Sequence, residues 1–119
     1  MDIATLSEKL KGICPLHHQS VRLENMPVKK VAICTGSGGG LMTSFFASGA
    51  DVYISGDLKF HDAKDAQARG LALIDVGHFA SEIIMTDLVA DRLAALVRAK
   101  DRDVRVDAFE GETDPFYYI

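Results

Sequence analysis

The sequence predicts an α/β fold of three layers, in which helical crossovers flank a largely parallel sheet of about four to five strands. The first observation is an alternation of short apolar segments with helical patterns over residues 28–108. The second is that Gly49 and Gly70 stand where the first two of these helices should end, since glycine adopts the left-handed conformation that ends many helices. Apolar strands that alternate with helices are typical of right-handed parallel crossovers.

The first 27 residues are interpreted as an N-terminal helix and an approach segment, followed by an α/β half-domain over residues 28–119. A short helix is expected over residues 5–13, because Leu6, Leu10 and Ile13 recur at helical spacing. Pro15 and Pro27 bracket a stretch that predicts a short edge strand around residues 21–23.

The later elements follow from apolar runs and from helical periodicity. Strands are expected over residues 28–34, 51–54, 71–74 and 103–108. Helices are expected over residues 41–48, 60–69 and 78–100, and the last of these carries one apolar stripe formed by Met85, Val89, Leu93 and Leu96.

The overall composition narrows the class of protein. The 119 residues are 48% hydrophobic and 25% charged, which is ordinary for one globular domain. A formal charge of −4 argues against nucleic acid or an anionic membrane as the main partner. No apolar run approaches the roughly 20 residues that span a bilayer. Two cysteines without a CxxC motif fit a reducing compartment, so a cytoplasmic location is expected.

The position of the polar residues in the expected sheet indicates where a site would lie. Ligands of open parallel sheets bind outside the carboxyl ends of the strands. The loops expected there cover residues 35–40, 55–61 and 75–82. They hold most of the chemically capable side chains of the chain, namely Asp57, Lys59, His61, Asp75, His78 and Glu82.

His78 and Glu82 form the leading candidate pair. At positions i and i+4 of a helix they are about 40° apart around the axis and roughly 6 Å apart along it, so both can reach one cation. Imidazole and carboxylate suit zinc, iron or manganese. The alternative is structural, with Glu82 favoured by the helix dipole and His78 bonded to backbone. Phe79 stands where a capping box would need Ser or Thr, which weakens that account.

The glycine-rich loop at residues 36–40 offers a second hypothesis, nucleotide binding. It lies between an expected strand and an expected helix, and Asp57 follows about twenty residues later, as a ribose-binding acid would. However, Leu41 replaces the third glycine of the dinucleotide fingerprint, and no Gly-Lys-Ser/Thr follows. The alternative interpretation is a tight turn with close backbone packing.

Two further histidine positions each have a functional and a structural interpretation. Neighbouring side chains on a helix diverge by about 100°, so His61 and Asp62 cannot both face one ion. His61 is either a proton shuttle at the ligand edge or a solvent-exposed residue at the start of a helix. The adjacent His17 and His18 are interpreted as solvated loop residues rather than ligands.

Two segments resemble a known family. Residues 49–63 and 73–82 are similar to the C-terminal half of the NIF-three-like proteins, which form rings, carry two metal ions and are sometimes labelled GTP cyclohydrolase-like. The loop at residues 35–39 and the ending Asp114-Pro115-Phe116 are similar too, so the resemblance covers about residues 28–119. It implies that His78 and Glu82 are ligands of divalent metal ions. The family's remaining ligands, a His-His pair and an aspartate, come from an N-terminal half that is not expected in this chain.

The resemblance also implies function and partners. A metal-dependent, hydrolase-like reaction on a small molecule is expected, with Lys59 or His61 assisting proton transfer. The missing ligands would come from an N-terminal-half partner chain, from an oligomeric neighbour or from a longer protein, and a homo-oligomer is expected. The alternatives are a non-catalytic oligomerisation or regulatory module, for which Phe116, Tyr117 and Tyr118 would make contacts, and a nucleotide-binding domain.

Overall fold

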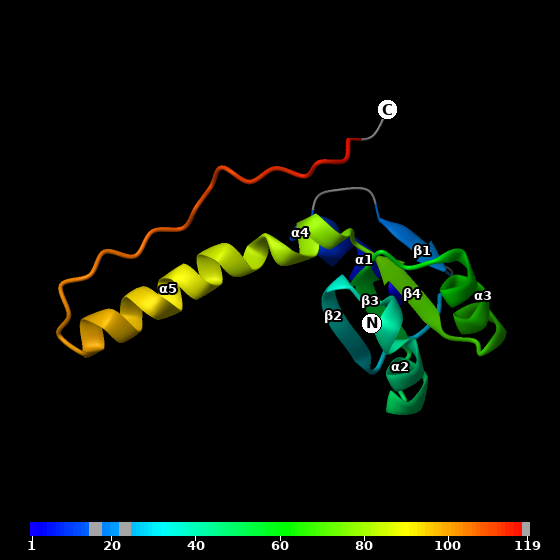
Figure 1. Ribbon diagram of the computed structural model, residues 1–119. Helices are drawn as coiled ribbons and strands as arrows, with labels where there is room; N and C mark the ends of the chain where they lie inside the picture. The colour runs from blue at the N-terminus through cyan, green and yellow to red at the C-terminus, as the bar shows by residue number, and fades with distance from the viewer. Residues whose placement is uncertain (15–17, 22–24, 118–119) are drawn as a thin grey trace. The chain divides into compact units, whose positions relative to one another are not determined.

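The computed structural model describes residues 1–14, 18–21 and 25–117 (Figure 1). The chain divides into two compact units, residues 1–81 and residues 82–119. The first unit contains the sheet, and the second contains the longest helix and the extended segment that follows it.

The sheet has four strands in the order β1-β4-β3-β2. They are β1 (Gln19–Val21), β2 (Val31–Ser37), β3 (Val52–Gly56) and β4 (Ala72–Asp75). The three strands β2, β3 and β4 are parallel to one another, and β1 joins the β4 edge in the antiparallel direction. The prediction of a largely parallel sheet is therefore confirmed.

Helices connect these strands as parallel crossovers require. In the first unit they are α1 (Ile3–Lys11), the 3-10 turn η1 (Gly39–Leu41) with α2 (Met42–Ser48), and α3 (Phe60–Ala68), followed by α4 (His78–Glu82), which ends in the second unit. Asp2 caps α1 by accepting a hydrogen bond from the Thr5 amide at 2.8 Å. Gly49 ends α2 in the left-handed conformation, as its position in the sequence predicts.

Each face of the sheet has its own apolar core, which confirms the three-layer prediction. Ile54 and Ile74 pack on one face with Ile3 of α1 and Ala80 of α4. Alternate strand residues point to the opposite face, where a second cluster forms with α2 and α3 from Met42, Phe45, Ala50, Tyr53, Ala66 and Leu73. Burial on both faces explains why β3 and β4 are almost continuously apolar.

The first two strand boundaries differ from the sequence-based prediction. The strand expected over residues 28–34 is found at Val31–Ser37. Residues 27–28 pair instead with the two residues before α1: Pro27 forms a bridge with Asp2, and the Val28 amide donates to the Met1 carbonyl. The edge strand expected at residues 21–23 is found at Gln19–Val21, and residues 22–24 lie outside the described part of the chain.

The last two predicted elements were wrong in larger respects. The helix expected over residues 78–100 is divided at Ile83 into α4 and α5 (Ile84–Ala99). Ile83 keeps right-handed helical backbone angles, so the division is a local change of hydrogen bonding. The strand expected over residues 103–108 is absent, since this segment is extended without any strand partner among the described residues. Alternating apolar residues favour a strand only where a neighbour completes its hydrogen bonds.

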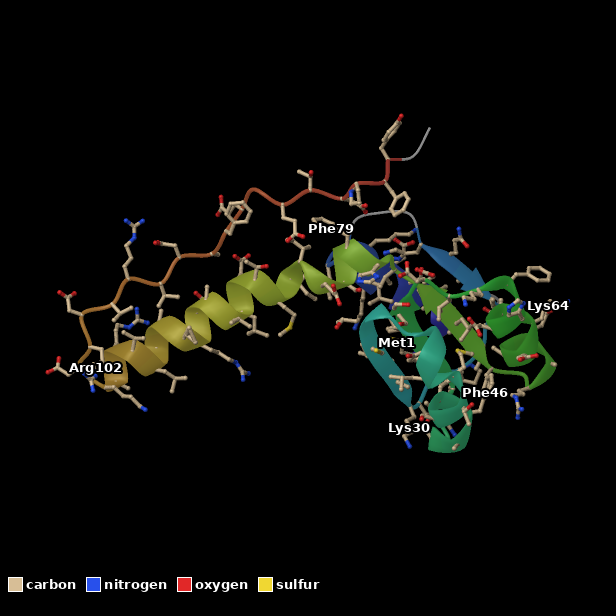
Figure 2. The ribbon with its side chains drawn as sticks, viewed as in Figure 1. Met1, Lys30, Phe46, Lys64, Phe79 and Arg102 are labelled. Carbon is tan, nitrogen blue, oxygen red and sulfur yellow. The ribbon has the colours of Figure 1, made fainter. Side chains whose placement is uncertain are left out.

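The second unit contains no buried residue within α5. Side chains project along the whole length of this helix (Figure 2). Its exposed apolar residues are Ile84, Met85, Leu88, Val89, Leu93 and Leu96. Phe116 and Tyr117, near the end of the chain, are also exposed. Among the described residues, no helix is long and apolar enough to cross a membrane.

Candidate metal centre

The candidate site of the first unit lies where three parallel strands end together. Ser37 of β2 pairs with Gly56 of β3, and Ser55 of β3 pairs with Asp75 of β4. The loops after β2, β3 and β4 therefore begin side by side at the carboxyl edge of the sheet. This is the edge at which the sequence predicted the polar side chains to gather.

Backbone packing places the start of α4 against the end of β3. A Cβ atom at Gly56 would lie 2.6 Å from the backbone nitrogen of His78 and 2.7 Å from the Gly77 carbonyl carbon. Gly77 itself has a φ of 85°, a conformation that side chains rarely adopt. Glycine at both positions allows the chain to turn sharply and to bring His78 to the sheet edge.

Asp57 and His78 are in side-chain contact at this edge. Asp57 follows β3 directly and holds a left-handed backbone, with φ of 54°. Its Oδ2 atom lies 2.6 Å from Nδ1 of His78, and both side chains are about half exposed. A carboxylate on one ring nitrogen fixes the tautomer and orientation of a histidine, and metal-binding histidines commonly have such a partner. The sequence placed both residues at this edge but did not pair them.

Asp75 ties the loops after β3 and β4 together. Its Oδ2 atom accepts a hydrogen bond from the Leu58 amide at 2.8 Å, and its Oδ1 atom accepts one from the Gly77 amide at 2.9 Å. Both carboxylate oxygens therefore hold backbone on either side of the Asp57–His78 contact. We assign Asp75 a positioning role in this chain.

The glycine-rich loop is held from behind by buried side chains. Ser81 accepts a hydrogen bond from the Gly36 amide at 2.9 Å and donates to the His78 carbonyl at 2.8 Å. The Tyr53 hydroxyl donates to the Gly38 carbonyl at 3.1 Å. Burial raises the pKa of Tyr53, which keeps this hydroxyl protonated as a donor at neutral pH.

Two amides of this loop, those of Gly36 and Gly38, are used in hydrogen bonds within the fold. The Gly38 amide donates to the Gly56 carbonyl, and the Leu41 amide donates to the Gly38 carbonyl, in addition to the Gly36–Ser81 bond. A phosphate site at such a turn needs several amides directed at the anion. These bonds favour the interpretation of residues 36–40 as a tight, closely packed turn.

His78 and Glu82 are the first and last residues of α4, so they keep the i, i+4 spacing that places two side chains on one helix face. Imidazole and carboxylate fit the donor preferences of zinc, iron and manganese. Within residues 1–14, 18–21 and 25–117, no group of three or more His, Cys, Asp or Glu side chains is arranged to hold an ion. The donor chemistry thus fits a metal ion, but two ligands do not complete a closed site.

The remaining candidate residues lie at the start of α3 and in the N-terminal segment. The Lys59 amide donates to the Asp62 carboxylate at 2.8 Å, which caps α3, and the side chains of Lys59 and His61 are exposed. His18 is half-buried, with its Nε2 atom 2.7 Å from the Cys14 carbonyl oxygen. It is therefore not the solvated loop residue that the sequence predicted. His17 lies outside the described residues.

Comparison with known proteins identifies the family. The model of the Duf34/NIF3 (NGG1p interacting factor 3) family matches residues 1–115. The chain belongs to the Duf34/NIF3 family. The match confirms the resemblance found in the sequence and extends it over the N-terminal 27 residues, which the resemblance did not cover.

Curated relatives of this Duf34/NIF3 chain are much longer than it is. A protein of Streptococcus pneumoniae serotype 4 named "GTP cyclohydrolase 1 type 2 homolog" is 36% identical over 110 residues, which are 92% of this chain and 41% of the relative. A protein of the same name in Staphylococcus aureus strain MSSA476 is 39% identical over 95 residues, or 80% of this chain and 26% of the relative. The chain thus spans less than half of each relative.

Solved structures that match this chain also belong to longer proteins. The crystal structure of Staphylococcus aureus hypothetical protein SA1388 matches with a TM-score of 0.90 and 32% identity, over 100% of this chain and 40% of that one. A Bacillus cereus protein related to NIF3 matches with a TM-score of 0.88 and 32% identity, over 100% of this chain and 33% of that one. These matches confirm the mixed α/β fold.

Proposed function

We propose that this chain is a metal-ion-binding domain of the Duf34/NIF3 family, in which His78 and Glu82 supply part of the ligand set for divalent ions such as zinc, iron or manganese. The observation that carries the proposal is the 2.6 Å contact between Asp57 and His78 at the carboxyl edge of the sheet. Because the chain spans 26% to 41% of its relatives, a partner chain or the rest of a longer protein would complete the site.

The proposed chemistry is hydrolase-like, in keeping with relatives named "GTP cyclohydrolase 1 type 2 homolog". A bound divalent ion would lower the pKa of a coordinated water, as in other metal-dependent hydrolases. In this chain, Asp57 contacts Nδ1 of the His78 ring at 2.6 Å, which would leave Nε2 for the metal ion. Lys59 and His61, exposed at the start of α3, are the proposed proton-transfer groups for a small-molecule substrate.

Metal analysis tests the ligand assignment directly. Zinc is titrated into the purified chain and into a His78→Ala, Glu82→Ala double variant, and bound zinc is measured at equilibrium without dialysis, because an incomplete ligand set holds an ion weakly. We expect the native chain to bind zinc more tightly than the double variant. A Glu8→Ala, Glu112→Ala variant removes two exposed carboxylates away from the site and should bind zinc as the native chain does. Equal zinc in the native chain and in the His78→Ala, Glu82→Ala variant would refute the assignment.

Asp57→Asn tests whether the carboxylate supports His78. Loss of such a partner typically lowers metal affinity by about 10–100-fold, and we expect a decrease of that size in a competition assay with a coloured zinc chelator. Nitrogen-15 NMR of the metal-free protein gives a second readout, since the tautomer of His78 should change in Asp57→Asn. An unaltered tautomer together with unaltered affinity would remove Asp57 from the site.

A second function, assembly without catalysis, is favoured by the exposed apolar residues of α5. An apolar helix side in water usually has an occupant. If the metal assays show no bound ion in any form of the protein, this assembly role becomes the leading function.

A further inference from the structure

The segment that follows α5 is extended but forms no strand, and it has no strand partner among the described residues. Residues 103–109 alternate, with Val104, Val106 and Ala108 on one face and Arg105 and Asp107 on the other. Among the described residues, no backbone–backbone hydrogen bond involves residues 103–117. Unpaired donors and acceptors in a row form a template for another strand.

An apolar groove lies between this segment and α5. It has a volume of about 430 Å³ and is lined mainly by apolar residues, namely Met85, Val89, Ala90 and Leu93 of α5 and Val106, Ala108 and Phe109 of the extended segment, with Thr86 and Asp107 as its polar members. The same residues of α5 are half-exposed, and Phe109 is 73% exposed. The second unit thus has an open apolar side next to open strand hydrogen bonds.

We infer that residues 102–110 pair in the antiparallel direction with the same segment of a second copy of this chain, about a two-fold axis at Val106. In this register Arg105 of each copy lies opposite Asp107 of the other. Arg102 lies opposite Glu110 in the same way. Opposite charges on directly facing positions stabilise an antiparallel pair, and a two-fold axis provides each contact twice.

The alternative registers next to this one bring like charges together. An axis at Arg105 would place the two Arg105 side chains opposite each other, and an axis at Asp107 would do the same with the two carboxylates. Like charges on facing positions are destabilising. In the single chain, Nε of Arg105 already lies 2.7 Å from Oδ2 of Asp107, so both groups project on one side and are exposed. Pairing of two copies would join them into a four-charge cluster of alternating sign.

The paired segments would form a two-stranded ribbon. Its face with Val104, Val106 and Ala108, the valine face, requires apolar residues packed against it. A two-stranded ribbon alone is marginally stable in water, whereas packing against a helix supports it. Val106 and Ala108 already line the groove beside Met85, Val89 and Leu93. The two α5 helices would therefore cover the valine face of the ribbon, while the Asp107 side chain, which also borders the groove, is 60% exposed and open to the charge pairing.

Sedimentation equilibrium of the purified chain tests the association itself. We expect a concentration-dependent rise from the 12.9 kDa of the single chain to twice that mass. A single species of 12.9 kDa up to several hundred micromolar would overturn the proposal. This measurement requires no metal, so its result is independent of the ligand assignment of His78 and Glu82.

Charge reversal tests the pairing partners. Arg105→Asp places four acidic groups at the axis, and Asp107→Arg places four basic groups there, so each variant alone should dimerise about tenfold more weakly than the native chain. A mixture of the two variants should recover dimers, because acid then faces base again. Lys64→Asp makes an equal charge change on the exposed face of α3 and should leave the dimer affinity of the native chain unchanged. Equal weakening by Lys64→Asp, or no recovery in the mixture, would contradict specific pairing.

Cysteine cross-linking tests the register. In a Cys34→Ser background, Val106→Cys places a thiol opposite its own copy and should form a disulfide-linked dimer under mild oxidation. Val104→Cys faces Ala108 of the other copy instead and should cross-link far less. Circular dichroism confirms that each variant is folded. Comparable cross-linking at both positions would reject an axis at Val106.

Discussion

The two compact units of this chain differ in how they use their apolar residues. Every buried residue of the described chain lies within residues 1–81, where helices cover both faces of the sheet. Residues 82–117 have none, although α5 and the segment after it are comparably apolar. A high content of apolar residues is therefore not sufficient to form a buried core. A helix and a single extended segment leave apolar surface and backbone groups open.

Truncating one apolar side chain in each unit should give the largest difference in the free energy of unfolding. Ile74 is fully buried, so Ile74→Ala is expected to lower the free energy of unfolding by about 2–5 kcal/mol. Leu93 is 48% exposed, so Leu93→Ala should change it by less than about 1 kcal/mol. Urea denaturation at low micromolar concentration measures both. A loss at Leu93 as large as that at Ile74 would show that the second unit has a core of its own.

Replacing one glycine by alanine in each unit compares the stability of the two units at single backbone positions. A Cβ atom at Gly38 would lie 1.9 Å from Oγ of the buried Ser55, so Gly38→Ala should destabilise the fold by about 1–3 kcal/mol. A Cβ atom at Gly111 would lie 2.5 Å from the ring of Phe109, which is exposed and can turn away. Gly111→Ala should therefore be within about 0.5 kcal/mol of the native chain in thermal unfolding. Equal losses would indicate a fixed Phe109 ring.

The smallest expected effect concerns acid stability of the first unit. Hydrogen bonds from the backbone amides of Lys30 and Lys29 lower the pKa of Asp51 below its usual value of 3.8. The stabilisation is therefore present above that value and is lost as the pH falls through the lowered pKa. We expect the melting temperature of the native chain to decline more steeply below pH 4 than that of Asp51→Asn. Parallel declines would exclude Asp51 as a source of acid sensitivity.

Local sequence signals predicted most of the first unit. The apolar runs and the glycines after α2 and α3 indicated the parallel strands and crossover helices to within a few residues. The residues of the candidate site were placed at the right edge of the sheet because parallel strands carry their loops to one side. The Asp57–His78 contact was not predicted, since it joins two loops through space. Its only signal in the sequence was that one residue follows β3 and the other follows β4.

The sequence by itself determined the order of strands and helices, the tight turns at glycine and the chemical types gathered at the sheet edge, because these depend on neighbours along the chain. Only the tertiary structure decided which groups touch, such as Asp75 with the amides of Leu58 and Gly77. It also decided that residues 103–108, strand-like in pattern, form no strand here. A strand is stabilised by its neighbour, and no local pattern specifies whether that neighbour is present. His78 and Glu82 illustrate both parts: spacing along α4 marked them as a pair, while the partners that would complete a metal site depend on the assembled protein.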